Sequence, residues 1–289
     1  MKINGYTRMA AVVAQPIKHS LSPFIHNLAF DLMQENGVYV AWEVESTDLS
    51  ACVENVRRLN MYGLNISMPY KHAVLELLDE LTPAAQLIGA VNTVVNHDGK
   101  LVGHNTDGIG FFKSLEKVEF DVKKQVITVI GGGGAAIAII VQAALLGAKK
   151  INVLARQSSS YELLKLRLSD LKLQTGIEIE LTDLSVLTEV QKRISESKLL
   201  VNATSVGMDG RSMPLSAEIS LSDQLVVDVI YKISETPFLK WAKLKGNQVE
   251  NGLGMLLGQA AESFELWTGK VMPVEKIAEE LEKNEKITD

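Results

Sequence analysis

Cysteine is almost absent from this chain, and long apolar runs are absent altogether. The 289 residues include one cysteine, Cys52, so an internal disulfide is excluded. The longest strongly apolar stretch, residues 135–148, is shorter than the ~20 residues that a membrane-spanning helix needs, and Gln142 interrupts it. The N-terminus has no apolar signal core, so we expect a protein of the reducing cytoplasm.

Concentrated charge and clustered histidines are also absent. The net charge is −6 and the basic residues come at most in doublets such as Arg57-Arg58, so nucleic acid is an unexpected partner. The five histidines include no pair at helical spacing beside a carboxylate cluster, so no metal site is expected. The 46% hydrophobic content suffices for two domains that each bury a core.

The order of apolar patterns predicts two α/β domains. Short apolar runs alternate with helical patterns in the first third, at residues 10–14, 23–34, 39–44, 49–60 and 63–66. This rhythm is typical of βαβ units and a mostly parallel sheet. A second series of strands is predicted at residues 126–130, 151–154, 198–202 and 225–228. We therefore expect an α/β protein of two domains, the first at residues 1–108 and the second at residues 109–250.

The C-terminal segment, residues 252–282, is helical in pattern and too apolar for a free tail. A hydrophobic helix needs a partner surface, and the first domain would provide one. We expect the C-terminal helices, within residues 251–289, to complete that domain and to place Gln259 at an interdomain cleft.

A glycine turn at residues 131–136 predicts a dinucleotide site. It follows the apolar strand 126–130 and precedes the apolar helix 137–146. A helix that begins in glycines leaves bare backbone N–H groups, against which a pyrophosphate can bind. The pattern Gly131-x-Gly133-x-x-Ala136 is the dinucleotide fingerprint in its proper context. The alternative is a glycine-rich turn that binds no ligand.

The strand after the fingerprint ends in a basic residue. Arg156 follows strand 151–154, and no acidic residue appears before Glu162. An acid at this place would bind the ribose of NAD, whereas an arginine can bind the 2′-phosphate of NADP, with Ser158 and Ser159 as further donors. The pattern favours NADP over NAD. The alternative is that Arg156 is a solvated loop residue.

Two polar segments that follow apolar strands are candidates for acid–base chemistry. They are residues 65–71, which end in Lys71, and residues 105–108, which include Asp107. A lysine near an aspartate in a partly desolvated cleft can have its proton affinity tuned for acid–base catalysis. The commoner alternative is a surface lysine at the start of a helix over 72–78.

Two further segments have both a structural and a functional interpretation. Ser22 before Pro23 is typical of a helix N-cap, and the same helix start can bind an anionic substrate through hydroxyls and N–H groups. The loop at residues 202–208 follows a strand, so it is either a cofactor-lining loop or an ordinary Ser/Gly turn.

Together these segments resemble the shikimate dehydrogenase family, including its shikimate/quinate branch. They occur in family order over nearly the whole chain. The segments that carry the resemblance are His19-Ser20-Leu21-Ser22-Pro23, Asn65-Ile66-Ser67-Met68-Pro69-Tyr70-Lys71, Gly89-Ala90-Val91-Asn92-Thr93, Asn105-Thr106-Asp107-Gly108, residues 131–136, residues 202–208, and Gly252-Leu253-Gly254-Met255 with Gln259.

The resemblance implies an NADP-dependent oxidoreductase that reversibly reduces 3-dehydroshikimate to shikimate, on the pathway to chorismate and the aromatic amino acids. It implies Lys71 as acid/base and Asp107 as its partner. The substrate carboxylate would be bound by Ser20, Ser22 and Tyr231, and the ring hydroxyls by Ser67, Asn92, Asp107 and Gln259. The cofactor would be bound by Gly131, Gly132, Gly133, Gly134, Ala135, Arg156, Thr204, Val229 and Gly252. The resemblance also implies that residues 1–108 form the substrate-binding catalytic domain and residues 109–250 the Rossmann-type NAD(P)-binding domain. It implies a homodimer as well.

Departures from the family pattern leave the cofactor and the substrate less sharply defined. Ile137 and Ala155 differ from the family pattern near the adenosine half of the cofactor site, so an NAD-using quinate/shikimate dehydrogenase is the alternative. Ser67 stands where many shikimate-specific members have threonine, and the lost methyl group could admit quinate. Two rival hypotheses are a non-catalytic NAD(P)-binding sensor and a dehydrogenase for another small substrate, such as an amino-substituted analogue.

Overall fold

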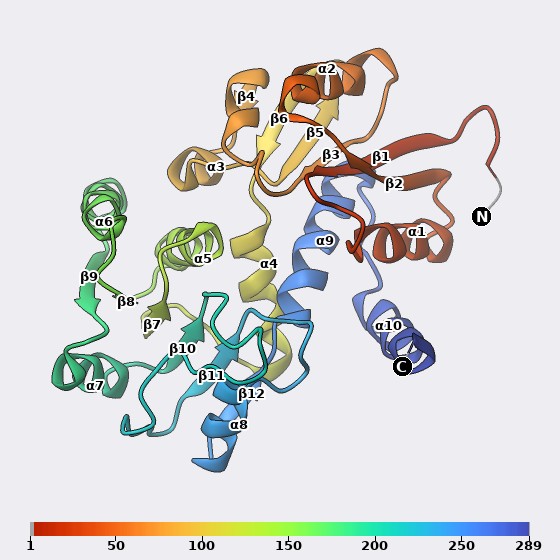
Figure 1. The fold of residues 1–289 in the computed structure, drawn as a ribbon. Coiled ribbons are helices and arrows are strands. Elements are labelled where there is room, and N and C mark those ends of the chain that lie inside the picture. The colour runs from red at the N-terminus through yellow and green to blue at the C-terminus, as the bar shows by residue number, and fades with distance from the viewer. Residues whose placement is uncertain (1–2, 289) are drawn as a thin grey trace. The chain divides into compact units, whose positions relative to one another are not determined.

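The computed structural model describes residues 3–288, with side chains up to residue 283, and divides into two compact α/β units (Figure 1). The first unit combines the chain up to Thr106 with the C-terminal part from Leu257 onward. The second unit is the segment Asp107–Leu256. The polypeptide therefore leaves the first unit once and returns to it through a C-terminal helix.

The first unit is built on a mixed, six-stranded sheet with the order β2-β1-β3-β5-β6-β4. Strand β1 is parallel to β2 and β3, β5 is antiparallel to β3 and β6, and β4 is parallel to β6. The bounds are β1 (Arg8–Ala14), β2 (Gly37–Glu43), β3 (Gly63–Ile66), β4 (Glu80–Leu81), β5 (Thr93–His97) and β6 (Lys100–His104).

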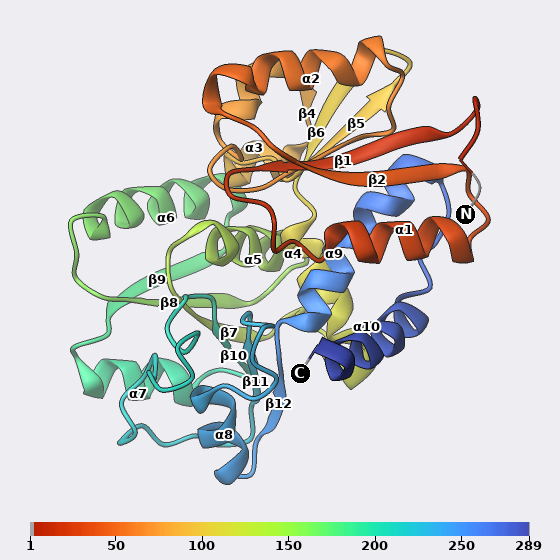
Figure 2. The same ribbon diagram turned by 45° about the vertical axis from the view of Figure 1, so that its right-hand side comes forward.

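Helices cover both faces of this sheet, with α2 on one face and α1 and α9 on the other (Figure 2). The buried residues Val53 and Val56 of α2 share a hydrophobic core cluster with Leu64 of β3. On the opposite face, the indole Nε1 of Trp267 donates a hydrogen bond to the Val94 carbonyl at 3.0 Å. The helices are α1 (Ser22–Leu32), α2 (Leu49–Arg58), α3 (Pro83–Ile88), α9 (Leu253–Thr268), α10 (Val274–Thr288) and the 3-10 turns η1 (Ser46–Asp48) and η2 (Ala73–Leu77).

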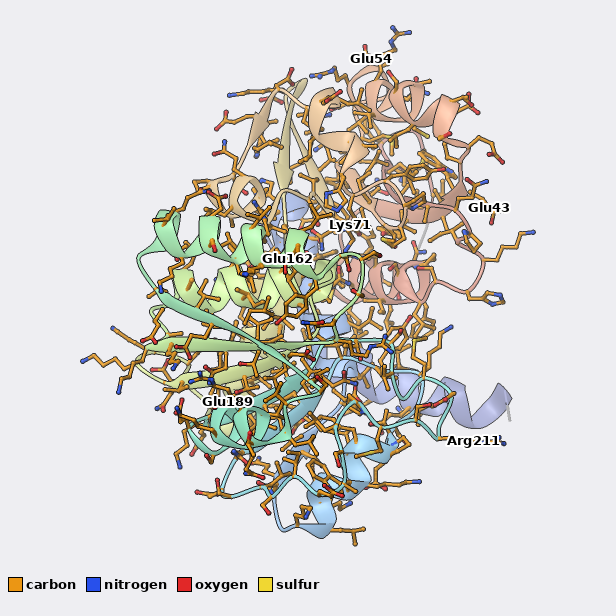
Figure 3. The ribbon with its side chains drawn as sticks, turned by 60° about the vertical axis from the view of Figure 1, so that its left-hand side comes forward. Glu43, Glu54, Lys71, Glu162, Glu189 and Arg211 are labelled. Carbon is orange, nitrogen blue, oxygen red and sulfur yellow. The ribbon has the colours of Figure 1, made fainter. Side chains whose placement is uncertain are left out.

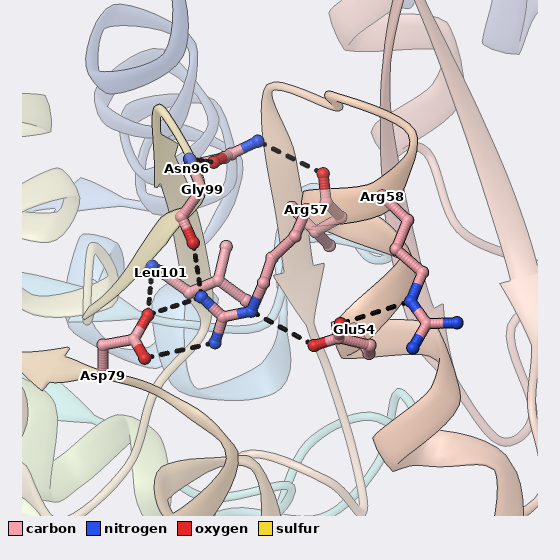
Figure 4. A network of polar contacts seen from close by, with 8 residues as sticks. Glu54, Arg57, Arg58, Asp79, Asn96, Gly99 and Leu101 are labelled. Atoms are coloured by element: carbon pink, nitrogen blue, oxygen red, sulfur yellow. Dashed lines mark hydrogen bonds and ion pairs between the residues drawn. The ribbon is translucent and has the colours of Figure 1, made fainter.

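An arginine clamp ties the end of α2 to the β5–β6 turn (Figure 4). Arg57 binds both carboxylate oxygens of Asp79, at 2.6 and 3.2 Å, and donates to the Gly99 carbonyl. Asp79 also accepts a hydrogen bond from the Leu101 amide at 2.7 Å. The Arg57 guanidinium and this amide lower the pKa of the Asp79 carboxyl group.

The second unit has an all-parallel sheet with the order β12-β11-β10-β7-β8-β9. Counted from β7, this is the Rossmann order 3-2-1-4-5-6, whose switch point lies between β7 and β10. The strands are β7 (Val126–Ile130), β8 (Lys150–Ala155), β9 (Glu178–Asp183), β10 (Leu199–Asn202), β11 (Leu225–Asp228) and β12 (Gln248–Glu250). The helices are α4 (Asp107–Ser114), η3 (Glu116–Val118), α5 (Gly134–Leu145), α6 (Tyr161–Thr175), α7 (Leu187–Ser195) and α8 (Pro237–Leu244).

The predicted fold class is confirmed, and several local expectations are corrected. The helix expected over 72–78 is the 3-10 turn η2, five residues long. Ser22 is not the N-cap of α1: the cap position is Leu21, and the Ser22 amide donates to the Ser20 hydroxyl at 3.2 Å. No described side chain caps the start of α1. No helix among residues 3–288 is long and apolar enough to cross a membrane.

Candidate functional site

The backbone around Lys71 is fixed by its neighbours on both sides. The Tyr70 ring belongs to the core cluster, and its hydroxyl donates to the Val44 carbonyl and contacts Gln15 Oε1 at 3.1 Å. The Lys71 carbonyl accepts a hydrogen bond from the Val91 amide at 2.8 Å. The side chain is half-buried and lies at the end of the unit away from Glu54 of α2 (Figure 3). A long flexible side chain therefore starts from a well-defined position.

Buried polar side chains surround Asn92 in the same unit. Asn92 is 3% exposed; its Oδ1 accepts from the Thr106 amide at 2.8 Å, and its Nδ2 donates to Thr106 Oγ1 at 3.0 Å. The Thr93 hydroxyl contacts Asn92 Oδ1 at 3.0 Å and the Ser263 hydroxyl at 2.8 Å. The hydroxyl of Ser263, on α9, also donates to the Gln259 carbonyl at 2.9 Å. This network holds Asn92 and the α9 turn that bears Gln259 in one arrangement.

A second chain of hydrogen bonds leads from Tyr39 into this network. The buried Tyr39 hydroxyl donates to Asn65 Oδ1 at 2.6 Å. Asn65 Nδ2 donates to Thr93 Oγ1 at 3.1 Å and contacts Ser263 Oγ at 3.1 Å. Tyr39, Asn92 and Gln259 are therefore connected through buried groups of the first unit. Ser67 follows β3, and its amide donates to the Val13 carbonyl at 2.9 Å.

The glycine turn has the geometry that a pyrophosphate requires. Helix α5 begins at Gly134, and its N-cap Gly133 provides no side-chain hydrogen bond. A Cβ added at Gly133 or Gly134 would meet no atom within 4 Å, so the helix start is open. Gly131 has a φ of +116°, and a Cβ there would lie 2.9 Å from Thr204 Cγ2. The residues present fit the phosphates of a dinucleotide, because bare N–H groups at a helix start bind anions.

Arg156 is exposed directly after β8, beside the glycine turn in this sheet order. Ser158 and Ser160 form a hydroxyl pair at 3.0 Å in the same loop. A guanidinium in such a loop can bind a phosphate in a bidentate manner. The position fits the adenosine end of a dinucleotide whose pyrophosphate lies at α5.

The loops after β10 and β11 are joined by buried polar groups. Asn202 Oδ1 accepts from the amide and the hydroxyl of Thr204, at 3.1 and 2.7 Å. Asn202 Nδ2 donates to Asp228 Oδ1 at 3.1 Å. Gly252 lies so close to the second loop that a Cβ would stand 2.0 Å from the Val229 carbonyl oxygen. Thr204, Val229 and Gly252 therefore belong to one ordered region.

The predicted site residues fall into two groups. Six belong to the first unit: Ser20, Ser22, Ser67, Lys71, Asn92 and Gln259. Asp107 opens α4 in the second unit, which also contains Tyr231 and the nine predicted cofactor residues. Burial raises the pKa of the half-buried Tyr231 hydroxyl. The pairing of Lys71 with Asp107 stays a prediction, as does the joint binding of a carboxylate by Ser20, Ser22 and Tyr231.

Sequence reasoning gave no role of their own to the supporting residues Thr106, Ser263, Asp228 and Thr236. Asp228 offered a signal, because it ends the otherwise apolar strand β11 at the carboxyl edge of a parallel sheet. Ser263 offered none, because its partner Asn65 is 198 positions away along the chain. Among residues 3–283, whose side chains are described, no cluster of three or more His, Cys, Asp or Glu side chains could hold a metal ion.

Comparisons with known proteins decide the family. The chain is 68% identical over 284 residues to "Shikimate dehydrogenase (NADP(+))" of Lactococcus lactis subsp. cremoris strain MG1363, covering 98% of this chain and 99% of that relative. The chain belongs to the shikimate dehydrogenase family. Family profiles match as "Shikimate dehydrogenase substrate binding domain" over residues 12–94 and as "Shikimate 5'-dehydrogenase C-terminal domain" over residues 252–282.

Solved structures of shikimate dehydrogenases have the same fold. The shikimate 5-dehydrogenase from Listeria monocytogenes, in complex with shikimate and NAD, aligns with a TM-score of 0.94 at 42% identity, covering 97% of this chain and 98% of that chain. The enzyme from Thermus thermophilus, in complex with NADP(H) and shikimate, aligns with a TM-score of 0.81 at 36% identity, covering 94% and 97%. The predicted family is therefore confirmed in sequence and in fold.

Proposed function

We propose that this chain catalyses the reversible, NADP-dependent interconversion of shikimate and 3-dehydroshikimate. The observation that carries the proposal is full-length 68% identity to a relative named for that reaction. The open helix start at Gly133 and Gly134 supports it, because a dinucleotide needs such an anion site. The first unit would bind the substrate and the second the cofactor.

NADP, when bound, supplies the hydride acceptor, and NADPH the donor. Lys71 has the complementary task of moving the proton of the substrate's secondary hydroxyl group. During oxidation, Lys71 accepts this proton as the carbon–hydrogen bond gives up its hydride; during reduction, its ammonium group returns a proton to the ketone oxygen. Asp107 orients Lys71.

Hydrogen bonds from polar side chains would make the site selective for its substrate. Ser20 and Ser22 lie at the start of α1, where hydroxyls and the positive end of the helix dipole suit a carboxylate. Ser67, Asn92 and Gln259 would pair with ring hydroxyls, with Tyr231 as a further carboxylate partner. A site with this many polar groups rejects an analogue that leaves them unpaired, often by several orders of magnitude.

The matching cofactor assignment is NADP rather than NAD. Arg156 would bind the phosphate on the adenosine ribose, residues 131–135 the pyrophosphate, and Thr204, Val229 and Gly252 the nicotinamide end. The exposure of Arg156 and the absence of an acid between residues 155 and 161 support this assignment.

An initial-rate assay tests the proposal directly. Purified protein is given shikimate or quinate, each with NADP+ or NAD+, and the reduced nicotinamide is followed by its absorbance. The proposal predicts that shikimate with NADP+ gives the highest kcat/KM. Dominant quinate or NAD+ rates would move the chain to the dual-substrate branch, and the absence of turnover in all four mixtures would favour a non-catalytic sensor.

A further inference from the structure

Asp228 is a fully buried carboxylate that the reaction scheme above does not use. It ends strand β11 with 0% exposure, next to the predicted cofactor residue Val229. Burial raises the pKa of its carboxyl group, while three donors oppose that shift. A buried charged or polar group is costly unless its hydrogen bonds are made, so the arrangement around Asp228 is specific.

One carboxylate oxygen organises the loop after β10. Asp228 Oδ1 accepts from Asn202 Nδ2 at 3.1 Å and from the Ile230 amide at 3.1 Å. The contact with Asn202 fixes its side-chain amide so that the oxygen faces Thr204. This oxygen accepts hydrogen bonds from both the backbone amide and the hydroxyl of Thr204. Asn202 Nδ2 also donates to the Val206 carbonyl at 3.0 Å. The position of Thr204 is thereby coupled to Asp228.

The other oxygen organises the loop after β11. Asp228 Oδ2 accepts from the Thr236 hydroxyl at 2.7 Å, and Thr236 caps α8 by accepting from the Leu239 amide. Both ends of the loop 229–236 are thus attached to one side chain. The same loop contacts the start of α9, because the Gly252 amide donates to the Ile230 carbonyl at 3.0 Å.

We propose that Asp228 is a positioning residue for the nicotinamide end of the cofactor site. Its carboxylate holds the loops that contain Thr204 and Val229 in fixed positions relative to each other. The inference rests on the proposed function, because that function assigns these loops to the nicotinamide. The inference goes beyond the proposed function, because it assigns to one buried side chain the positioning of the nicotinamide end and not of the adenosine end. The side-chain hydrogen bonds of Asp228 go to Asn202, Ile230 and Thr236, which all lie in or beside these two loops, so the adenosine end at Arg156 is independent of it.

The test separates the two halves of the cofactor with two ligands. NADPH requires both halves of the site, whereas adenosine 2′,5′-bisphosphate occupies only the half assigned to Arg156. For the full-length Asp228→Ala protein, we expect the Kd of NADPH to rise at least about 10-fold, with the Kd of adenosine 2′,5′-bisphosphate unchanged. Asp228→Asn keeps the shape and an acceptor oxygen, so it should restore NADPH binding toward the wild-type value.

Thr236 offers a milder perturbation with a matched control. Thr236→Val removes one arm of the network and should weaken NADPH binding selectively, while Thr236→Ser keeps the hydroxyl and should not. Thr128→Val is the control, since Thr128 is also fully buried in the second unit but pairs its hydroxyl with Ser197 instead. This variant should bind both ligands like the wild type.

Two results would overturn the inference. Equal weakening of both ligands in Asp228→Ala and Thr236→Val would indicate general destabilisation, and unchanged NADPH binding in both would show that the network positions nothing. These results are distinct from failure of the proposed function, which would appear as wild-type protein that binds NADPH but does not oxidise shikimate.

Discussion

His26 shows at the level of one residue how burial creates a pH dependence. Its ring stacks on the Tyr39 ring with the centroids 4.3 Å apart, and neither ring nitrogen has a hydrogen-bond partner among the described residues. Burial lowers the pKa of His26 to about 3. The folded protein therefore keeps this histidine neutral where an unfolded chain, with a pKa near 6.5, would bind a proton.

The sign of the effect follows from proton counts. Above about pH 6.5 both states hold a neutral imidazole, so His26 adds no pH dependence. Between about pH 6.5 and 3 the unfolded state binds more protons, so the free energy of unfolding decreases as the pH falls, by about 1.4 kcal/mol per pH unit at most. The pKa of His104 is also lowered by burial and acts in the same direction.

We therefore predict that His26→Phe makes the protein less sensitive to acid. Phenylalanine can keep the stack on Tyr39 without a titratable group. Urea unfolding at pH 7.5 and 5.5 should show a stability loss about 1.4 kcal/mol smaller in the variant than in the wild type. Equal acid sensitivity of His26→Phe and wild type would contradict the account.

At the scale of elements, substitution of two glycines on neighbouring helices should change the stability of the protein to very different extents. A Cβ on Gly108 of α4 would lie 2.4 Å from the Ala138 carbonyl oxygen of α5, whereas one on Gly134 would meet no atom within 4 Å. Gly108→Ala should lower the free energy of unfolding by about 1–3 kcal/mol through overpacking. Gly134→Val should change it by less than about 1 kcal/mol.

NADPH binding provides a second comparison of these two glycine variants. Gly134→Val fills the open helix start, so it should raise the Kd of NADPH at least about 10-fold while the protein stays folded. Denaturant unfolding and fluorescence titration of both variants provide the check. A Gly134→Val protein that binds NADPH normally would show that the pyrophosphate does not approach this helix start.

The elements differ in how far the sequence predicts them. Strands β3, β7 and β11 have the predicted bounds, because each is a short and mostly apolar run. The β5–β6 hairpin was missed although Asp98-Gly99 offered a two-residue turn signal, and both residues have positive φ. Strands β9 and β12 were also missed, since one has a mixed pattern and the other only three residues. Ser22 is the first helical residue rather than the predicted N-cap, a one-residue difference that is ordinary at a helix boundary.

At the scale of the molecule, the order of the motifs along the chain, which matches the family, predicted more of the candidate site than the local sequence patterns did. The polar segments after β1, β3 and β10 were found because functional residues follow strand ends in α/β folds. The supporting networks were not, because they join residues distant along the chain: Asn65 meets Ser263, and Asp228 meets Asn202. Such contacts depend on strand order and register, which apolar periodicity does not encode.

The division into two units predicts two separate patterns of ligand protection. By hydrogen exchange, NADPH alone should slow exchange in residues 131–136 and 202–208, and shikimate alone in residues 20–22 and 65–71. The reason is that most of the residues proposed to bind each ligand belong to one unit, and Asp107 and Tyr231 of the second unit are the exceptions for shikimate. Protection of residues 20–22 and 65–71 by NADPH alone, with none at 131–136, would contradict the assignment of the units.

The most direct measurement compares wild type with Lys71→Ala in the reductive reaction, with 3-dehydroshikimate and NADPH at matched saturation. The account predicts rapid NADPH oxidation by the wild type and a loss of at least about 100-fold in kcat for the variant, with the Kd of NADPH unchanged. Near wild-type turnover by Lys71→Ala would show that another group moves the proton, and no turnover by the wild type would refute the proposed reaction.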